Sequence, residues 1–126
     1  MANEKARILL VDDEPALAKL MQTVLSRSGY AVDVCGDAPS AFAAFERTTD
    51  PYEVVVADVT LPGLSGQDMA VQMLQEHPSL RVLLCSGYPV ALESLPDNVQ
   101  NRVAYLQKPF LPNMLAKALE ELIAQS

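Results

Sequence analysis

Five polar residues of this sequence stand at the ends of short apolar runs. In chain order they are Asp12, Asp13, Asp58, Ser86 and Lys108. If those runs are strands of one parallel sheet, their carboxyl ends share an edge, where open α/β folds bind their ligands. Carboxylates without histidine or thiolate suit Mg²⁺, whose coordination shell is usually completed by water and phosphate oxygens. A lysine charge and a hydroxyl donor suit a phosphoryl group. The set therefore indicates phosphoryl chemistry on a carboxylate.

Asp58 is the candidate nucleophile of this set. It stands alone at its strand end, whereas Asp12 and Asp13 form a pair better suited to holding a metal ion. A carboxylate that attacks phosphorus forms an aspartyl phosphate, a known kind of covalent intermediate. Three carboxylates at one edge would repel one another, and their pKa values would rise unless a cation neutralised them.

Each of these residues also has a simpler structural interpretation. Asp13 could cap a helix, Ser86 could be a turn hydroxyl, and Lys108 could be a solvated lysine. Asp58 taken alone is explained as well by a turn as by chemistry. The order of the whole set and its shared position at strand ends favour a joint function over these separate explanations.

Hydrophobic patterning predicts the strands that must position these residues. The run Val54-Val55-Val56-Ala57 before Asp58 is β-branched or small without polar alternation, which predicts a strand covered on both faces. Asp33 interrupts the second strand and indicates that it lies at an edge of the sheet. The predicted strands are Arg7–Val11, Tyr30–Cys35, Val54–Asp58, Arg81–Cys85 and Val103–Gln107.

Helical segments alternate with these strands. Ser65 is expected to cap the third helix, and His77 to be a solvated cation at its end. The first helix is expected to bury Leu17, Leu20, Met21, Val24 and Leu25. Helices are predicted from Pro15 to a terminal Gly29, from Ala38 to about Thr48, from Gly66 to His77, around Val90 to Leu95, and from about Pro112 to Ala124. This alternation predicts a doubly wound, parallel α/β sheet with helices on both faces.

Composition restricts the partners of the chain. Its 126 residues carry no internal repeat or linker, so residues 1–126 are expected to form one domain with a polar tail at about 1–5. With 9 Lys and Arg against 16 Asp and Glu, the net charge of -7 disfavours direct binding of nucleic acid or anionic membrane. The sequence shows no signal peptide and no apolar membrane span, and Cys35 and Cys85 are expected to be buried as small hydrophobic residues and not to form a disulfide. We therefore expect a cytoplasmic location.

The sequence resembles the receiver domains of two-component response regulators, either stand-alone or attached to hybrid sensor kinases. The resemblance covers essentially the whole chain and implies a flavodoxin-like fold with strand order 2-1-3-4-5. Four motifs carry it: Leu10-Val11-Asp12-Asp13-Glu14, Val56-Ala57-Asp58 with Leu61-Pro62-Gly63-Leu64-Ser65-Gly66, Leu84-Cys85-Ser86-Gly87, and Tyr105-Leu106-Gln107-Lys108-Pro109-Phe110.

The resemblance implies a metal site beside a phosphoacceptor. Asp58 would accept a phosphoryl group from a phosphohistidine. Asp13, Asp58 and the main-chain carbonyl of Thr60 would hold Mg²⁺ or Mn²⁺, and Asp12 would act through water.

The resemblance also implies a switch. Lys108 and the hydroxyl of Ser86 would contact the phosphoryl oxygens, and Tyr105 would turn inward when Ser86 moves. The bond from Lys108 to Pro109 is expected to be cis.

Two further residues are hypothesised to modulate the site. Thr60 and Tyr88 each stand two positions beyond a site residue and could shield the phosphoryl group from water. The segment Ser86-Gly87-Tyr88-Pro89 and the weak helix after it resemble receivers of hybrid kinases, so the partner face is left open.

The resemblance implies protein partners on both sides of the switch. The donor would be a sensor histidine kinase or a histidine phosphotransfer protein, and the reader would be a downstream output protein or domain. The chain would assist its own phosphorylation and dephosphorylation without being a turnover enzyme.

Three other interpretations remain open at this stage. A haloacid-dehalogenase-like phosphatase normally needs a second acid two residues after the nucleophile, where this sequence has Thr60. A nucleotide- or flavin-binding domain would need a Gly-rich loop where Asp12-Asp13-Glu14-Pro15 stands. A receiver-like interaction module that is never phosphorylated is the third, and the complete residue set argues against it.

Overall fold

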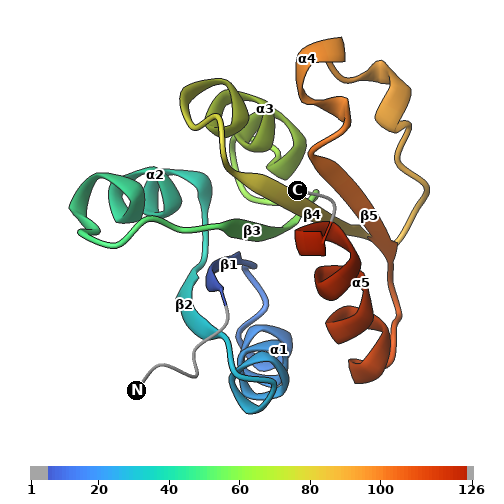
Figure 1. The fold of residues 1–126 in the computed structure, drawn as a ribbon. Helices are drawn as coiled ribbons and strands as arrows, with labels where there is room; N and C mark the ends of the chain where they lie inside the picture. The colour runs from blue at the N-terminus through green and yellow to red at the C-terminus, as the bar shows by residue number, and fades with distance from the viewer. Residues whose placement is uncertain (1–5, 125–126) are drawn as a thin grey trace.

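Five parallel strands form the sheet at the centre of the molecule (Figure 1). The computed structural model describes residues 6–124, so the predicted tail at about 1–5 lies outside the described residues. The strands are β1 (Arg7–Val11), β2 (Ala31–Cys35), β3 (Val54–Asp58), β4 (Arg81–Ser86) and β5 (Val103–Gln107). Their order, β2-β1-β3-β4-β5, confirms the predicted fold class and topology.

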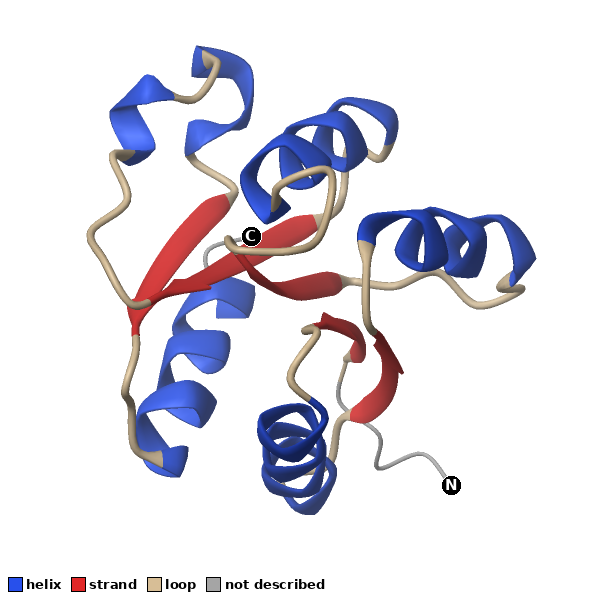
Figure 2. Ribbon diagram, turned by 180° about the vertical axis from the view of Figure 1, so that it is seen from behind, coloured by secondary structure: helices blue, strands red, loops and turns tan. Residues whose placement is uncertain are grey.

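Helices cover both faces of the sheet. They are α1 (Pro15–Arg27), α2 (Ala38–Arg47), α3 (Gly66–Glu76), α4 (Asp97–Gln100) and α5 (Pro112–Ala124), with a short 3₁₀ helix, η1 (Leu92–Ser94), before α4. Figures 1 and 2 both show α1 and α5 on one face and α2, α3 and α4 on the other. Two apolar cores result, one between each helical layer and the sheet.

The central strand β3 is the most enclosed of the sheet. All of its residues are buried, and it pairs with β1 on one side and β4 on the other. Its β-branched residues fit this position because both faces of the strand pack against helices. The strand therefore fixes the backbone of Asp58, its last residue, in a rigid part of the molecule.

The edge strand β2 is tied to its neighbours by a polar cluster. Asp33, which is exposed, accepts a hydrogen bond from Arg7 Nη2 at 2.8 Å and one from the Tyr52 hydroxyl at 2.7 Å. The guanidinium of Arg7 also lies over the Tyr52 ring, 4.5 Å from its centroid. The polar residue that marked β2 as an edge strand thus links it to β1 and to the segment before β3.

Helix ends follow local capping chemistry. Ser65 accepts a hydrogen bond from the amide of Asp68 at 3.1 Å, which confirms it as the N-cap of α3. Asp37 caps α2 in the same way through the amide of Ser40. Gly29, after α1, has a φ of 102°, a left-handed conformation that glycine adopts without a steric penalty.

The crossover from β4 to β5 differs most from the prediction. The single short helix expected around Val90 to Leu95 is reduced to η1, and α4 follows it after Pro96. The side-chain amide of Gln100 donates to the carbonyls of Glu93 and Leu95, at 3.2 and 2.7 Å, and holds the two turns together. Sequence periodicity gives no signal for pieces this short.

Several side chains lie differently from their predicted positions. Leu20, expected in the buried stripe of α1, is 54% exposed, and Ala18 is buried in its place. A small residue lets the helix approach the sheet closely.

The expectation of a solvated His77 is wrong, because its half-buried ring stacks on Phe45 with centroids 4.6 Å apart. Cys85 is buried as expected, whereas Cys35 is half-buried, and both thiols are free.

Arg102 joins the start of β5 to the end of α3. Its guanidinium donates four hydrogen bonds to main-chain carbonyls, those of Leu74, His77, Pro78 and Leu80. A cation is favourable there because the carbonyls at a helix C-terminus carry partial negative charge.

None of the helices in the described part of the chain is long and apolar enough to cross a membrane.

Candidate functional site

The carboxyl edge of the sheet brings together two buried carboxylates and a lysine. Asp58 ends β3 and is 7% exposed, and Asp12 directly follows β1 and is 3% exposed. Lys108 follows β5, and its Nζ lies 2.9 Å from Asp58 Oδ2 and 3.7 Å from Asp12 Oδ2. Three segments that are far apart in the sequence thus meet as predicted, because parallel strands end on the same side.

The electrostatics of this cluster are set by burial and by close opposite charges. Burial raises the pKa of Asp12, against the lowering effects of the Glu14 amide and of Lys108. Burial alone would lower the pKa of Lys108, but its hydrogen bond to Asp58 and the charges of Asp12, Asp58 and Glu14 raise it. Lys108 is therefore a cation at neutral pH, whereas burial favours the neutral form of the Asp12 carboxyl group and so raises its pKa.

The donor set fits a hard divalent cation. Carboxylate oxygens of Asp12, Glu14 and Asp58 lie within 4.8 Å of one another. Asp12 Oδ1 accepts a hydrogen bond from the Glu14 amide at 2.8 Å, but its buried Oδ2 has no hydrogen-bond partner among the described residues. A buried oxygen without a donor costs free energy unless a cation or water satisfies it. All of the candidate ligands are oxygens, as Mg²⁺ and Mn²⁺ prefer.

Two of the predicted metal ligands, Asp13 and the main-chain carbonyl of Thr60, are not part of the group of converging carboxylates. Asp13 is exposed and borders a hollow shared with Lys19, Cys35 and Asp37, outside the group of carboxylates that converge. Thr60 donates its amide to Asp58 Oδ1 at 3.1 Å, so its backbone lies beside the acid. The roles of Asp13 and of the Thr60 carbonyl in metal binding stay predictions.

The predicted switch residues form a connected set at the ends of β4 and β5. Ser86 is 1% exposed, and its hydroxyl accepts a hydrogen bond from the Tyr88 amide at 3.1 Å. Tyr105 donates its hydroxyl to the main-chain carbonyl of Tyr88 at 2.7 Å. The Tyr88 hydroxyl in turn lies 3.4 Å from Thr60 Oγ1. Tyr88 therefore contacts each of the other three residues.

The backbone around the site is held at two close contacts. The amide of Lys108 donates to the carbonyl of Ser86 at 2.7 Å, and the bond from Lys108 to Pro109 is cis, as predicted. Gly66, the first residue of α3, packs against the main chain of Asp58. A Cβ at that position would lie 2.0 Å from the Asp58 carbonyl oxygen, so only glycine fits.

Sequence reasoning missed two residues of this site. The sequence gives Glu14 no role of its own beyond its place in a motif, although a third acid after Asp12 and Asp13 is itself a signal of negative charge at this strand end. Gly66 is identified from the sequence only as the end of a motif and the start of a helix, because its contact with Asp58 depends on the angle at which α3 leaves the turn.

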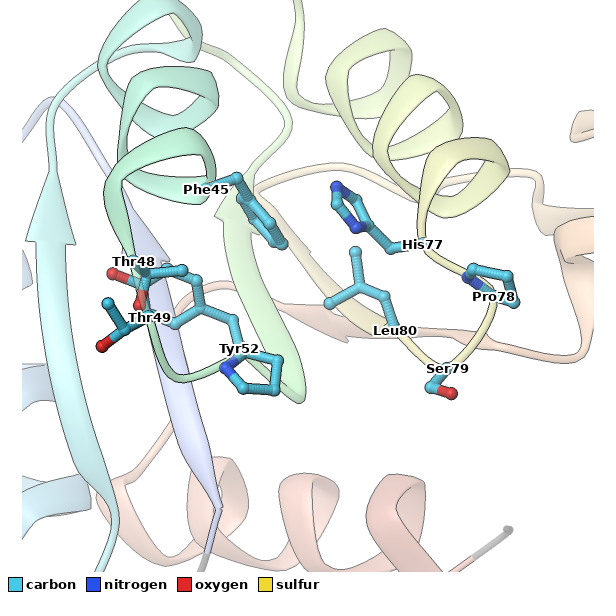
Figure 3. A pocket seen from close by; sticks show the side chains of 9 residues that line it. Phe45, Thr48, Thr49, Tyr52, His77, Pro78, Ser79 and Leu80 are labelled. Atoms are coloured by element: carbon cyan, nitrogen blue, oxygen red, sulfur yellow. The ribbon is translucent and has the colours of Figure 1, made fainter.

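A separate hollow of about 310 Å³ lies at the opposite edge of the sheet (Figure 3). Its walls include Tyr52, which precedes β3, and Leu80, which precedes β4, with Phe45 and His77 facing it from the ends of α2 and α3. Because the candidate site is at the carboxyl ends of the same strands, this hollow takes no part in its chemistry.

Comparison with known proteins agrees with the geometry. The family model described as the response regulator receiver domain matches residues 8–120. This chain belongs to that family. Receiver domains are phosphoacceptor signalling modules of two-component systems, so the resemblance noted from the motifs is confirmed. Family membership leaves no support for the phosphatase and the nucleotide- or flavin-binding interpretations.

Curated relatives of this receiver are regulatory proteins. The probable transcriptional regulatory protein TcrX of Mycobacterium tuberculosis is 37% identical over 111 residues, which cover 82% of this chain and 43% of the relative. The transcriptional regulatory protein QseB of Haemophilus influenzae is 33% identical, with coverage of 93% and 52%. The chain thus spans about half the length of these relatives.

Solved structures show the same fold. A two-component response regulator of the LuxR family from Aurantimonas sp. SI85-9A1 is 30% identical and superposes with a TM-score of 0.80. The match covers 96% of this receiver and 86% of that chain. The described arrangement of strands and helices is therefore found in the crystal structure of a two-component response regulator.

Proposed function

We propose that this receiver is a phosphorylation-dependent signalling switch in which Asp58 accepts a phosphoryl group. The observation that carries the proposal is the position of Lys108 Nζ, 2.9 Å from Asp58 Oδ2 and 3.7 Å from Asp12 Oδ2. A fixed cation beside a buried carboxylate is suited to hold the oxygens of a group that is being transferred to that carboxylate.

The proposed step is a phosphoryl transfer from a phosphohistidine. A carboxylate oxygen of Asp58 attacks phosphorus and forms an O–P bond as the N–P bond of the donor breaks. The electron pair of that bond goes to the imidazole nitrogen, which takes up a proton. Lys108 then contacts the phosphoryl oxygens, and the enclosed end of β3 keeps Asp58 oriented for attack.

Mg²⁺ or Mn²⁺ is the proposed cofactor. Asp12, Asp13, Asp58 and the main-chain carbonyl of Thr60 would hold it. The bound cation would neutralise charge on the carboxylates and on the incoming phosphoryl oxygens. The proposal is supported by the buried Asp12 Oδ2, which accepts no hydrogen bond among the described residues, and by the all-oxygen donor set.

The proposed switch runs through Ser86 and Tyr105. Phosphorylation adds up to about two negative charges and new acceptors beside Asp58. The Ser86 hydroxyl, which now accepts from the Tyr88 amide, would turn to donate to a phosphoryl oxygen. Because the Tyr88 carbonyl holds the hydroxyl of Tyr105, movement of this segment would be passed to Tyr105 and to the surface around it.

The proposed setting is that of a two-component pathway. The donor is a sensor histidine kinase or a histidine phosphotransfer protein, the reader is an output protein or domain, and the location is the cytoplasm. Residues 1–126 act as one receiver domain with no turnover reaction of their own. The net charge of -7 supports protein partners over direct contact with nucleic acid or membrane.

The direct test is intact-protein mass spectrometry after incubation with acetyl phosphate. With Mg²⁺ we expect the wild-type protein to gain the mass of one phosphoryl group, and the Asp58→Asn variant to gain none. Chelation of the metal should abolish the gain. A wild-type protein that stays unmodified under all conditions would instead be a receiver-like interaction module, and the proposal would be wrong.

A further inference from the structure

Glu14 contributes a third carboxylate to the cluster at the carboxyl edge. Its Oε1 lies 3.5 Å from Lys108 Nζ, the same amine that contacts Asp58 and Asp12. Carboxylate oxygens of Glu14, Asp12 and Asp58 lie within 4.8 Å of one another. Three formal negative charges therefore face one lysine, and a second cation is needed to balance them.

The buried oxygen of Asp12 is a second, independent observation. The Asp12 side chain is 1% exposed, and its Oδ2 faces the cluster with no hydrogen-bond partner among the described residues. An exposed acidic group alone would require no explanation. A buried carboxylate oxygen that accepts no hydrogen bond, with the amine of Lys108 still 3.7 Å away, supports the binding of a further cation at this cluster.

The backbone of Glu14 already serves α1, while its side chain does not. Glu14 is the N-cap of α1, and its carbonyl accepts a hydrogen bond from the amide of Ala18 at 2.9 Å. Its carboxylate makes no capping hydrogen bond. It borders, with Leu17, Gly87 and Lys108, a hollow of about 510 Å³ beside the site. The side chain therefore takes no part in capping α1; its oxygen Oε1 contacts Lys108 at the cluster, and a hydrated cation can reach it through this hollow.

We propose that Glu14 is a carboxylate of the divalent cation site, together with Asp12 and Asp58. It acts either as a direct ligand or through a water molecule of the cation. On binding, the cation replaces Lys108 as the counter-charge of Glu14, which leaves the lysine with Asp58. The inference rests on the proposed metal site, but it makes a separate claim about a residue outside the predicted ligand set.

The test is a titration of the full chain with MnCl₂, followed by the electron paramagnetic resonance signal of free Mn²⁺. Wild type is compared with Glu14→Gln, with Glu93→Gln as a control for an exposed acid on η1, and with Asp58→Asn to identify the site. We expect Glu14→Gln to weaken binding about tenfold, as loss of a ligand or of a group next to one does. Glu93→Gln should bind as wild type.

Salt separates binding at the site from a general charge effect. At about 0.5 M KCl, screening acts within a few ångströms, so a distant exposed charge loses its influence while a group at the metal does not. We expect the loss in Glu14→Gln to persist. A loss that disappears in salt, or an equal loss in Glu93→Gln, would overturn the role of Glu14.

The remaining outcomes separate this inference from the proposed function. If Asp58→Asn weakens Mn²⁺ binding and Glu14→Gln does not, Glu14 lies outside the site and the proposed function stands. If the wild-type protein binds no Mn²⁺, both the inference and the proposed metal site are wrong.

Discussion

Lys108 is the residue that balances the charges of this site. Its amine contacts Asp58 at 2.9 Å and Asp12 at 3.7 Å, and its side chain is 17% exposed. Removal of one partner from a buried ion pair leaves the other charge without compensation. The ion pairs of Lys108 therefore stabilise the receiver before any metal or phosphate binds.

This predicts a metal-dependent effect of Lys108→Met. When a chelator has removed divalent metal ions, we expect the free energy of unfolding of this variant to be about 3 kcal/mol lower than that of wild type, because Asp12 and Asp58 lose the lysine amine as their counter-charge. Mg²⁺ should restore more stability to this variant than it adds to wild type. Urea unfolding with and without Mg²⁺ measures both effects, and Lys117→Met, an exposed lysine on α5, is the control. Equal stability of Lys108→Met and wild type in the chelator would contradict this account.

Tyr88 offers a second prediction for a single residue. Its hydroxyl lies 3.4 Å from Thr60 Oγ1 beside Asp58, although the side chain is 54% exposed. If the two residues shield the phosphoryl group from water, Tyr88→Ala should lose phosphate severalfold faster than wild type in a mass-spectrometric time course. Tyr88→Phe, which keeps the ring, shows whether the ring or the hydroxyl matters. An unchanged rate in Tyr88→Ala means that Tyr88 does not shield.

The sequence was sufficient to predict those site residues that stand at or just after the end of an apolar strand. Asp12, Asp58, Ser86 and Lys108 meet as expected because parallel strands bring their ends together. The place of Glu14 could not be predicted, because it depends on where α1 begins and on the direction its side chain takes from that turn.

At the scale of elements, α3 determines how closely the chain can pack against Asp58. Gly66 begins this helix, and a Cβ there would lie 2.0 Å from the Asp58 carbonyl oxygen and 2.9 Å from the carbonyl carbon. A backbone contact cannot be relieved by rotating a side chain, so the helix or the end of β3 would have to shift.

We therefore expect Gly66→Ala to destabilise the receiver by about 2 kcal/mol, although alanine favours helices by itself. It should also slow phosphorylation by acetyl phosphate, since Asp58 is displaced. Urea unfolding and the phosphorylation time course measure the two effects. Gly36→Ala is the matched control, because nothing lies within 4 Å of a Cβ at that position. Equal effects of the two substitutions would contradict the role of the contact.

Tyr52 connects the elements at the other end of the sheet and predicts a pH dependence. Burial and the hydrogen bond to Asp33 raise the pKa of Tyr52 to about 12, from 10.0. The folded state therefore favours the neutral phenol. This contribution is fully present below pH 10.0 and is lost as the pH rises toward about 12, because the unfolded chain ionises first.

The expected loss is about 2 to 3 kcal/mol of unfolding free energy over that range. Tyr52→Phe lacks the ionisable group, so its stability should fall less steeply over the same range. Chemical unfolding of both proteins at several alkaline pH values measures the difference. Parallel curves for the two proteins would show that Tyr52 does not titrate with folding.

Elements marked by an apolar run or an apolar period could be predicted from the sequence, whereas those set by side-chain contacts could not. α5 has the predicted bounds because its apolar pattern repeats over enough residues to identify the helical period, and β3 has them because a continuous apolar run precedes Asp58. The crossover with η1 and α4 is set instead by Pro96 and by the side-chain hydrogen bonds of Gln100, which are contacts of the folded state.

At the scale of the whole molecule, two apolar cores hold a rigid sheet whose carboxyl edge carries the reactive groups. The central strands are enclosed, whereas the segment from β4 to β5 is irregular and carries Tyr88 near the site. This arrangement suits a switch, because a change of charge at Asp58 is resisted by the sheet and can be taken up by the crossover.

The central claim is that Asp58 is the phosphoacceptor, and borohydride trapping tests it most directly. Borohydride reduces an aspartyl phosphate to homoserine, which peptide mass spectrometry locates in the sequence. After incubation with acetyl phosphate and Mg²⁺, we expect homoserine at position 58 in the wild-type protein and none when the metal is chelated. Homoserine at position 12 or 13, or at no position, would contradict the account.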